Sequence, residues 1–412
     1  MSGASGRAAH PRTAARDRAA PRGRGAVVTG ENLTADVAVV GAGAVGAATA
    51  YFAARAGLRV VVLDRGALGG GTSSAGEGNV LVSDKDTGPE LELARHSQRV
   101  WREDLHEHGQ HWEFESKGGV VVASGAASLA ALRDLTARQR AAGVQAVDVG
   151  PDELAALESE LRPGLAGGAH YPEDAQVQPV LLVAHLLRLA SAAGARVLPH
   201  EPVTAFQRAG ERVTGVVTPR RTVAAPAVVN AAGTWAGEVA ALAGIRLPVL
   251  PRRGFVLVTE PLPPTIQHKV YAAEYVGDVG SSDAALQSSP VIEGTPAGTV
   301  LIGSTRERVG FDRRTSRAAL AALARGALGL FPALEGVRAI RAYHGFRPYC
   351  PDHLPVIGPD PRAPGLWHAC GHEGAGIGLS AGTGQLLAQA LTGRPTALGL
   401  APFAPEREGL AA

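Results

Sequence analysis

The chain reads VAVVGAGAVG at residues 37–46, a β-branched run followed by a glycine-rich turn. The run predicts a buried strand, and the alanine-rich residues 45–56 that follow predict a helix. A second β-branched run at residues 60–63 ends in Asp64. Strand, helix and strand in this order form a βαβ unit, which requires a parallel sheet and a right-handed crossover.

Residues 41–46 match the dinucleotide-binding fingerprint at its expected place between a strand and a helix. Gly41 permits the tight turn, Gly43 lets backbone N–H groups approach a diphosphate, and Gly46 allows the helix to pack closely. The helix N-terminus adds partial positive charge at the same point. Asp64 is placed to bond the ribose hydroxyls. The pattern predicts a dinucleotide site but does not choose between FAD and NAD.

Three further glycine-containing segments favour FAD. Residues 69–74 read GGGTSS, and their N–H groups and hydroxyls suit the diphosphate. Residues 228–235 read VVNAAGTW, a strand that ends in small residues and can approach a bulky ligand. Residues 371–378 read GHEGAGIG and open the last predicted helix, whose N-terminal dipole could stabilise an anionic flavin edge. An NAD enzyme needs only the first glycine cluster.

Composition excludes several classes of protein. Of the 412 residues 45% are hydrophobic and 19% charged, which supplies a packed core and excludes general disorder. The net charge of +2 argues against a nucleic-acid surface. Two cysteines cannot build a disulfide scaffold and indicate a reducing, cytoplasmic compartment. No apolar run is long enough for a transmembrane helix, and no histidine or cysteine spacing predicts a metal site.

The order of predicted elements indicates a mixed α/β (α+β) chain, in which a Rossmann-like FAD-binding domain is interrupted by a largely antiparallel substrate domain. Four strands, at residues 196–198, 203–206, 213–217 and 223–229, are expected to form an antiparallel run. The predicted boundaries are a disordered tail at 1–33, an FAD-binding domain at 34–85, 150–235 and 337–405, and a substrate domain at 86–149 and 236–336.

These motifs, together with DAQV at 174–177, NAAG at 230–233 and GFRP at 345–348, resemble the D-amino-acid-oxidase-like flavoprotein superfamily, which contains glycine oxidase and sarcosine oxidase. Residues 77–80 (EGNV), 83–85 (SDK) and 371–378 look most like the branch of D-hydroxyproline dehydrogenase, opine oxidase and the hydrogen-cyanide-synthase flavin subunits. Members of this branch often work with iron–sulfur and second flavin subunits, so such partners are expected here.

The resemblance implies oxidation of an amino or imino acid by hydride transfer from the α-carbon to N5 of a non-covalently bound FAD, giving an imine. A D-amino acid, D-hydroxyproline-like, is the expected substrate. Three alternatives stay open: a sarcosine- or glycine-type oxidase that uses oxygen, a flavin-bearing assembly subunit of a heteromeric dehydrogenase, and an NAD-linked dehydrogenase.

The resemblance also places the substrate carboxylate on Arg347, whose planar guanidinium matches a carboxylate; a structural ion pair is the alternative. Tyr275 and His344 are candidate site residues, with packing as their alternative role. Gly374 stands where glycine oxidase carries a second substrate arginine, so glycine itself is disfavoured as the substrate. The predicted cofactor-binding residues are Gly41, Gly43, Ala44, Val45, Gly46, Asp64, Arg65, Gly71, Thr72, Ser73, Ser74, Gly78, Asn79, Val203, Ala232, Gly233, Gly345, His372, Glu373, Gly374, Ala375, Gly376 and Ile377.

Overall fold

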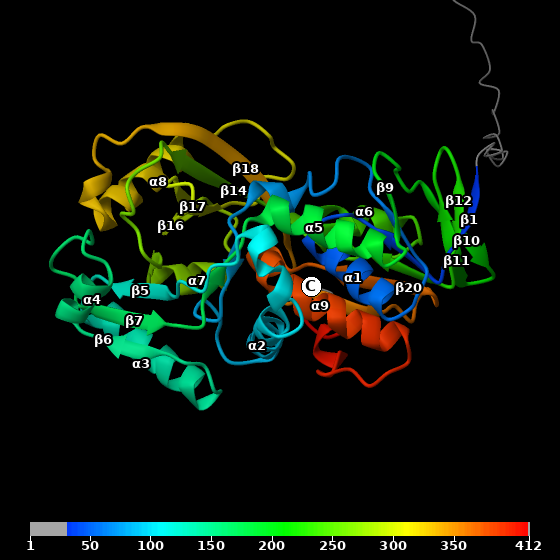
Figure 1. Cartoon of the computed structure of the whole chain (residues 1–412), viewed down its shortest axis with the longest axis horizontal. Coiled ribbons are helices and arrows are strands. Elements are labelled where there is room, and N and C mark those ends of the chain that lie inside the picture. The colour runs from blue at the N-terminus through cyan, green and yellow to red at the C-terminus, as the bar shows by residue number, and fades with distance from the viewer. Residues whose placement is uncertain (1–30, 411–412) are drawn as a thin grey trace, which may run out of the picture.

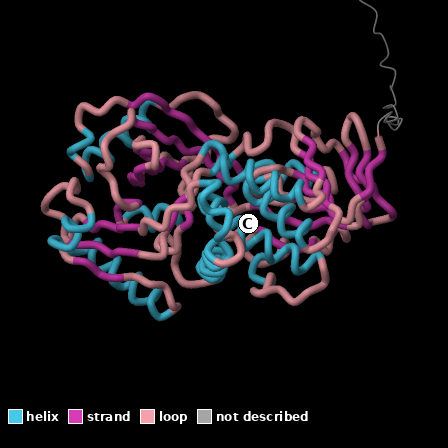
Figure 2. Tube along the Cα trace, viewed as in Figure 1, coloured by secondary structure: helices cyan, strands magenta, loops and turns pink. Residues whose placement is uncertain are grey.

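The computed structural model describes residues 31–410, apart from the side chains of residues 278 and 279. The chain forms two lobes side by side (Figure 1). Helices gather in the lobe that holds the N-terminal βαβ unit, and the other lobe is rich in strands (Figure 2). The C-terminal helix returns to the first lobe, so segments far apart in the sequence build that lobe together.

A six-stranded sheet forms the centre of the first lobe, with five parallel strands and one antiparallel edge strand. Its order is β19 (Val356–Pro359), β20 (Leu366–Cys370), β13 (Ala227–Asn230), β2 (Val37–Val40), β3 (Val60–Leu63) and β9 (Arg196–Leu198). The valine-rich strands β2 and β3 are buried at every residue, as expected for a parallel sheet covered on both faces.

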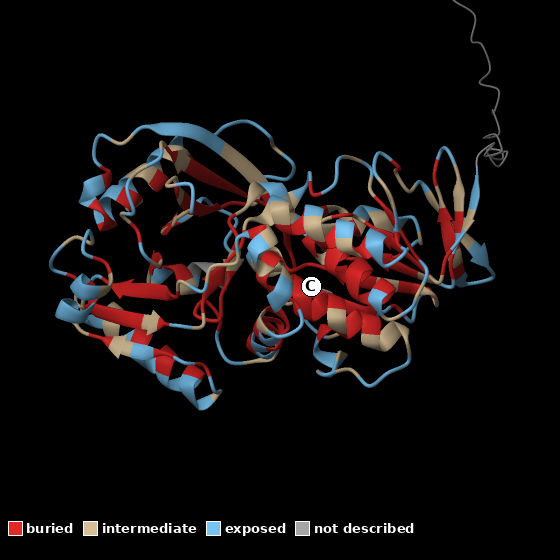
Figure 3. Ribbon diagram, viewed as in Figure 1, coloured by how far each residue is buried: buried red, intermediate tan, exposed pale blue. Residues whose placement is uncertain are grey.

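One face of this sheet packs against helices α1 (Ala44–Arg55), α2 (Pro89–Arg102), α5 (Pro179–Ala192) and α9 (Gly376–Leu391). The helix faces toward the sheet are almost entirely buried (Figure 3). Helices α1 and α9 approach closely, because a Cβ on Gly384 would lie 2.6 Å from the carbonyl carbon of Ala48. The alanines and glycines of these helices therefore bring the two helix N-termini near one another.

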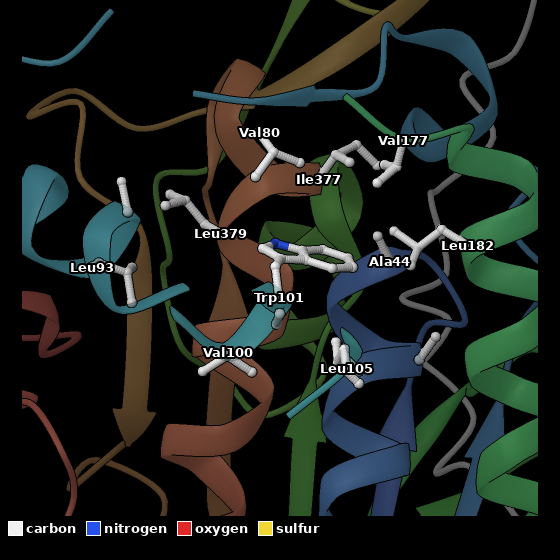
Figure 4. Close-up of a cluster of buried hydrophobic side chains, with 14 of the residues drawn as sticks. Ala44, Val80, Leu93, Val100, Trp101, Leu105, Val177, Leu182, Ile377 and Leu379 are labelled. Carbon is white, nitrogen blue, oxygen red and sulfur yellow. The ribbon is translucent and has the colours of Figure 1, made fainter. Parts of the chain in front are cut away.

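Trp101 fixes the beginning of α9 against α2. Its indole lies among apolar side chains of α1, α5 and α9 (Figure 4). The indole Nε1 donates to Gly378 O at 2.8 Å, and Ser97 Oγ donates to the same carbonyl at 2.5 Å. Two donors from α2 thus hold the first turn of α9 in place.

The other face of the parallel sheet packs against a small four-stranded sheet and helix α6 (Ala236–Ala241). This small sheet has the order β1 (Asn32–Thr34), β12 (Thr222–Ala224), β11 (Arg212–Val217) and β10 (Ala205–Ala209). Strand β1 corrects the predicted tail: residues 1–30 lie outside the described residues, but residues 32 and 33 are paired with β12. Leu33 favours the pairing because it packs on the buried cluster.

The second lobe is built on an eight-stranded sheet. Its order is β18 (Ala339–Tyr349), β14 (Leu250–Thr259), β17 (Val300–Arg306), β16 (Gln287–Gly294), β15 (Lys269–Ala272), β5 (Gly119–Ala123), β7 (Gly167–Tyr171) and β6 (Val147–Val149). All neighbouring pairs are antiparallel except β15 with β5. The remaining helices are α3 (Ala126–Ala141), α4 (Pro151–Leu157), α7 (Glu274–Val279) and α8 (Arg317–Leu330), and β4 (Asn79–Val80) pairs with β8 (Ala175–Gln176). The predicted fold class is confirmed.

The predicted boundaries differ from the observed pairing in both directions. The prediction places residues 150–171 and 337–349 with the FAD-binding domain, but β7 and β18 pair within the eight-stranded sheet. It places α2 and α6 in the substrate domain, whereas both pack in the first lobe. The periodicity of a segment shows that a strand or helix forms, but it does not show which sheet that element joins.

The predicted antiparallel run at residues 196–229 is also divided between two sheets. Strands β9 and β13 join the parallel sheet, and β10, β11 and β12 form the small one. Pro226 separates β12 from β13, since proline has no N–H to donate to a ladder. Within residues 31–410, no helix combines the length and the apolar character that crossing a membrane requires.

Candidate active site

The site lies at the point in the parallel sheet where the connections that leave two neighbouring strands run to opposite sides of the sheet. From β2 the chain continues to α1 and β3 on one side, and β13 is followed by β20 on the other. Such a switch point leaves a crevice at the carboxyl ends of the strands. Gly41, at φ +111°, is required there, because a Cβ on it would lie 2.4 Å from Ala231 O. The loops after β2 and β13 are thus in direct contact.

An outer cleft opens beside this contact, with a volume of about 1510 Å³ measured out to its mouth. Asp64 fixes its floor: Oδ2 accepts the N–H of Ala42 and Oδ1 that of Gly66, both at 2.8 Å. The guanidinium of Arg65 lies over the ring of Trp235, 4.2 Å from its centroid. The predicted cofactor residues that line the outer cleft are Gly41, Gly43, Asp64, Arg65, Gly71, Thr72, Ser73, Val203, Ala232 and Gly233.

An inner cleft of about 920 Å³ continues from the outer one and shares Gly43, Thr72, Ser73, Ala231 and Gly233 with it. Both helix N-termini reach the inner cleft, because residues 43–45 begin α1 and residues 376–377 begin α9. Its predicted cofactor residues are Gly43, Ala44, Val45, Thr72, Ser73, Asn79, Gly233, Gly345, His372, Glu373, Gly374, Gly376 and Ile377.

Hydroxyl groups hold the loop at residues 72–75 between the lobes. Ser73 Oγ accepts the N–H of Ala44, in the first turn of α1, at 3.0 Å. Thr72 Oγ1 and Thr234 Oγ1 both donate to Phe346 O, at 2.7 and 2.6 Å. The first turn of α1, the turn after β13 and strand β18 therefore all meet residues 72–75 around the two clefts.

Four predicted cofactor residues, Gly46, Ser74, Gly78 and Ala375, line neither the outer nor the inner cleft. A Cβ on Gly46 would lie 1.9 Å from Gly41 O, and one on Gly78 would lie 1.6 Å from Val177 O, so both glycines permit close backbone packing. Ser74 Oγ turns back to donate to Gly71 O at 3.2 Å. Ala375 lines a third, neighbouring cleft. These four stay predictions that the cleft geometry does not support, because a sequence motif does not show which of its members face the ligand.

The third cleft, called here the arginine cleft, is lined by Arg252, Arg306, Arg347, Tyr275 and Glu373, among others. It shares Tyr275, Arg347, Glu373 and Gly374 with the inner cleft. The three clefts thus form a row from Asp64 to the second lobe. Two of the three predicted catalytic residues, Arg347 and Tyr275, lie where the inner cleft meets the arginine cleft.

His344 lies away from that junction. Arg347 and His344 are three residues apart on β18, and side chains alternate along a strand, so they point to opposite faces of the sheet. His344 packs against the rings of Phe255 and Phe346, at centroid distances of 5.3 and 5.7 Å. Packing, the alternative role expected for His344, is what the structure shows.

Two hydrogen bonds to residues of β17 orient the guanidinium of Arg347. Nη1 donates to Thr305 O at 2.7 Å and Nη2 donates to Ser304 Oγ at 2.9 Å. Burial, and secondly the charge of Arg306, lower the pKa of Arg347 to about 10, so that it remains a cation at neutral pH. An oriented, partly desolvated guanidinium is suited to binding a carboxylate.

The inner cleft also contains His372, which is uncharged. Burial lowers its pKa to about 3, and Nε2 lies 3.1 Å from Thr383 Oγ1. Cys370 lines the same cleft, and burial raises its pKa to about 12. The pKa of the buried Cys350 is raised well above its ordinary value by the same cause. Both thiols are therefore poor nucleophiles, which favours non-covalent attachment of a cofactor.

Sequence reasoning missed Arg252, Arg306 and Glu77. Arg252 and Arg306 belong to none of the quoted motifs, and Glu77 lies within the EGNV stretch at 77–80 but is not among the predicted site residues. The spacing of Arg252 and Gly254 on one face of β14 was a usable signal for Arg252. Arg306 had no such local signal, because its place depends on the pairing of β17 with β14.

The clefts fit FAD. Glycines at 41, 43 and 233 leave the backbone bare beside the first helix N-terminus, as a diphosphate requires. Asp64 lies at the outer end for a ribose, and the inner cleft at the second helix N-terminus has room for a ring system. Two helix N-termini and two joined clefts match the two halves of one dinucleotide cofactor.

Comparison with known proteins agrees with this geometry. The family model described as FAD dependent oxidoreductase matches residues 36–390, and the chain belongs to this family. The hydrogen cyanide synthase subunit HcnC of Pseudomonas aeruginosa is 30% identical over 91% of this chain and 97% of its own length.

Two solved structures extend the likeness to the fold. Glycine oxidase from Geobacillus kaustophilus gives a TM-score of 0.82 at 29% identity, covering 92% of this chain and 100% of that one. Iminodiacetate oxidase from Chelativorans sp. BNC1 gives 0.78 at 26% identity, with 90% and 98% covered. The chain is therefore an FAD-dependent enzyme that oxidises amino-acid-like substrates at a CH–NH group.

Proposed function

We propose that the enzyme oxidises the bond between the α-carbon and the nitrogen of an amino or imino acid whose carboxylate pairs with Arg347. The observation that carries this proposal is the position of Arg347, which lines both the inner cleft and the arginine cleft. A substrate carboxylate held there would place the α-carbon at the junction of the two clefts. The D-configuration and the hydroxyproline-like side chain stay predictions.

The FAD would be held by Gly41 and Gly43, by Asp64, by residues 71–73 and by the first turn of α9. When bound, it accepts the hydride that leaves the substrate α-carbon, and the resulting imine is hydrolysed by water. The work of the chain is then to bind, orient and desolvate the substrate.

Arg347 and Arg306 also favour the reactive form of the amine. The nitrogen must be neutral before its α-carbon can release a hydride, and nearby positive charge lowers the pKa of an ammonium group. Arg306 lies 4.9 Å from the ring centroid of Tyr275, which lines the same junction. Arg347 would thus bind the carboxylate, and the charges of both arginines would help the ammonium group lose its proton to solvent. Tyr275, fully packed in the wall, would limit the position of the substrate.

The electron acceptor is the part of the function that the relatives leave open. The similarity to a subunit named for hydrogen cyanide synthase supports a partner that receives electrons, with iron–sulfur or second flavin subunits as the predicted kind. A glycine- or sarcosine-type oxidase that passes electrons to oxygen is the competing proposal, supported by the likeness to glycine oxidase.

The test is anaerobic mixing of the purified holoprotein with D-amino, L-amino and N-methyl amino acids while flavin absorbance is followed. Bleaching by at least one member of the panel is the expected result. A flavoprotein that no amino or imino acid reduces, with or without partner subunits, would indicate an assembly role instead. Admitting oxygen to the reduced protein then separates the acceptors, because an oxidase is reoxidised rapidly and a dehydrogenase slowly.

A further inference from the structure

One face of three neighbouring strands presents a group of arginines to the arginine cleft. Arg252 of β14 is the paired neighbour of Arg347 of β18. On the other side of β14, Arg253 exchanges both backbone hydrogen bonds with Glu307, at 2.9 and 3.0 Å. Because faces alternate along a strand, Arg306 lies on the same face as Arg252 and Arg347.

Two other arginines of these strands, Arg252 and Arg253, have acidic partners. On the opposite face, Arg253 pairs with Glu307 at 2.8 Å. Arg252, which is only 1% exposed, reaches Glu373 at 3.4 Å and donates to Ser281 O at 2.7 Å. The guanidinium groups of Arg252 and Arg253 are thus each matched by a carboxylate.

Like Arg347, Arg306 lacks such a carboxylate among the described residues. It is 5% exposed, its Nη1 is buried without a hydrogen-bond partner, and among residues 31–410 it forms no salt bridge. Its one described contact of note is the Tyr275 ring, 4.9 Å from the guanidinium carbon. A buried cation without an anion costs several kcal/mol. A ligand that brings the missing anion would offset this cost.

The nearest acid does not supply it. Glu77 lies close enough to Arg306 and Arg347 for both charges to lower its pKa, but burial raises that pKa more strongly. Its Oε1 is itself buried without a hydrogen-bond partner. The neighbouring Glu293 is paired with Lys269. The other carboxylates that line the arginine cleft are paired elsewhere: Asp84 and Glu90 with Lys85, Asp86 with Arg138, Asp352 with Arg407 and Glu373 with Arg252. Among the described residues, neither Arg306 nor Arg347 forms a salt bridge.

We infer that Arg306 binds a second carboxylate of the substrate, so that the enzyme acts on amines bearing two carboxylates, one held by Arg347 and the other by Arg306. This inference rests on the proposed function, since it assigns the first carboxylate to Arg347. It also narrows the substrate: a D-hydroxyproline-like molecule has one carboxylate and would leave Arg306 unpaired.

The arrangement of the strands makes such a bridge feasible. Arg347 and Arg306 lie on β18 and β17, with β14 between them, so their backbones are about 10 Å apart across the sheet. Both side chains line the same cleft, and both lie close enough to Glu77 and Tyr275 for their charges to act on the pKa of each. A secondary amine flanked by two short carboxylate arms spans a gap of this kind, with its nitrogen between the two cations.

The experiment uses matched pairs of ligands that differ by one carboxylate. The probes are sarcosine against iminodiacetate, and N-methylalanine against N-(carboxymethyl)alanine. Their dissociation constants for the holoprotein come from the concentration dependence of flavin reduction in anaerobic stopped flow. We expect the dicarboxylate of each pair to bind about 10- to 100-fold more tightly, as a charge-assisted hydrogen-bonded pair predicts.

Arg306→Met should remove that preference, raising the dissociation constant of the dicarboxylates about 10- to 100-fold and that of the monocarboxylates less than threefold. Arg306→Lys should retain part of it, because the charge remains and the planar fork is lost. Arg308→Met is the matched control: Arg308 is a partly exposed arginine two residues away that donates to Ser282 O at 2.7 Å. This control should leave both constants unchanged.

The outcomes separate this inference from the proposed function. Equal binding of the two members of each pair by the unaltered enzyme, or equal weakening of both by Arg306→Met, would overturn the second carboxylate while leaving the oxidation intact. Failure of every amine to reduce the flavin would overturn the proposed function itself. If Arg306→Met does not fold, the wild-type preference and Arg306→Lys decide the question.

Discussion

Replacing Arg347 with methionine should raise the dissociation constant of the substrate about 100- to 1000-fold and leave FAD bound. Methionine keeps much of the apolar stem and removes the guanidinium. The lost interaction is a charge-assisted pair in a desolvated cleft, worth about 3–4 kcal/mol when two hydrogen bonds to a carboxylate are broken. Each 1.4 kcal/mol corresponds to a factor of ten in affinity. The flavin half of the site stays intact, because Asp64 and both helix N-termini are untouched.

The same change should cost little stability. Burial and Arg306 lower the pKa of Arg347 to about 10, so the charged form is less favourable in the folded protein than in the unfolded chain at any pH below that value. Removing the charge relieves this cost, while the hydrogen bonds to Thr305 O and Ser304 Oγ are lost. We therefore expect the free energy of unfolding to change by less than about 1 kcal/mol.

The assay is anaerobic stopped flow, in which the substrate concentration giving half-maximal reduction rate is compared between variants, with the flavin spectrum as the check on FAD. Ser304→Ala is the graded control, since it removes one of the two orienting contacts of Arg347 and should weaken binding about three- to tenfold. If Arg347→Met binds substrate within threefold of the wild type, Arg347 does not hold the carboxylate and its guanidinium is structural.

Three further perturbations test other parts of the structure. Gly46→Ala should abolish flavin binding or folding, because its Cβ would lie 1.9 Å from Gly41 O; a normal flavin content in the purified variant would contradict this packing. Lys269→Met should lower the free energy of unfolding by about 3–5 kcal/mol by leaving Glu293 charged and unpaired. Adding Glu293→Gln should recover most of that loss in urea unfolding, and no recovery would refute the pairing. His372 has a pKa of about 3 when folded, so the unfolded chain binds its proton first and stability should fall by about 1.4 kcal/mol per pH unit as pH drops below about 6.5. His372→Gln should flatten this slope between pH 6.5 and 4.5, and an unchanged slope would assign it to other groups.

The nucleotide half of the site could be predicted because its signal is local. The glycine turn, the helix and Asp64 follow one another within the first βαβ unit, and the geometry of that unit brings them to one sheet edge. The contact of Gly41 with Ala231 then confirms that the second predicted glycine-rich loop belongs to the same edge. Residues that only support the motif, such as Gly46 and Gly78, were predicted as ligand contacts because the sequence does not separate packing from binding.

The substrate half could be predicted only in part, because it depends on strand pairing. Alternation along β18 was sufficient to separate His344 from Arg347, which are three residues apart. Arg306 needed more information: its face follows from the register of β17 against β14, and register is set by long-range packing rather than by neighbours in the sequence. The same dependence explains why the sequence places residues 150–171 and 337–349 with the FAD-binding domain although β7 and β18 pair within the eight-stranded sheet.

The glycines of the second lobe explain how its sheet comes to border the cofactor clefts. A Cβ on Gly254 would lie 2.1 Å from Nη1 of Arg347, and one on Gly345 would lie 2.7 Å from the Cβ of Ala75. Any larger residue at Gly254 would push the guanidinium off Thr305 O, and any larger residue at Gly345 would push the sheet away from the loop at residues 72–75. Because these two glycines are paired neighbours on β14 and β18, they form one bare strip across the sheet. That strip lets the side chain of Arg347 cross β14 toward Thr305 O of β17 instead of projecting from the sheet. The guanidinium therefore lies low on the sheet where the inner cleft meets the arginine cleft, and a carboxylate can bind it there without entering the space that the cofactor needs.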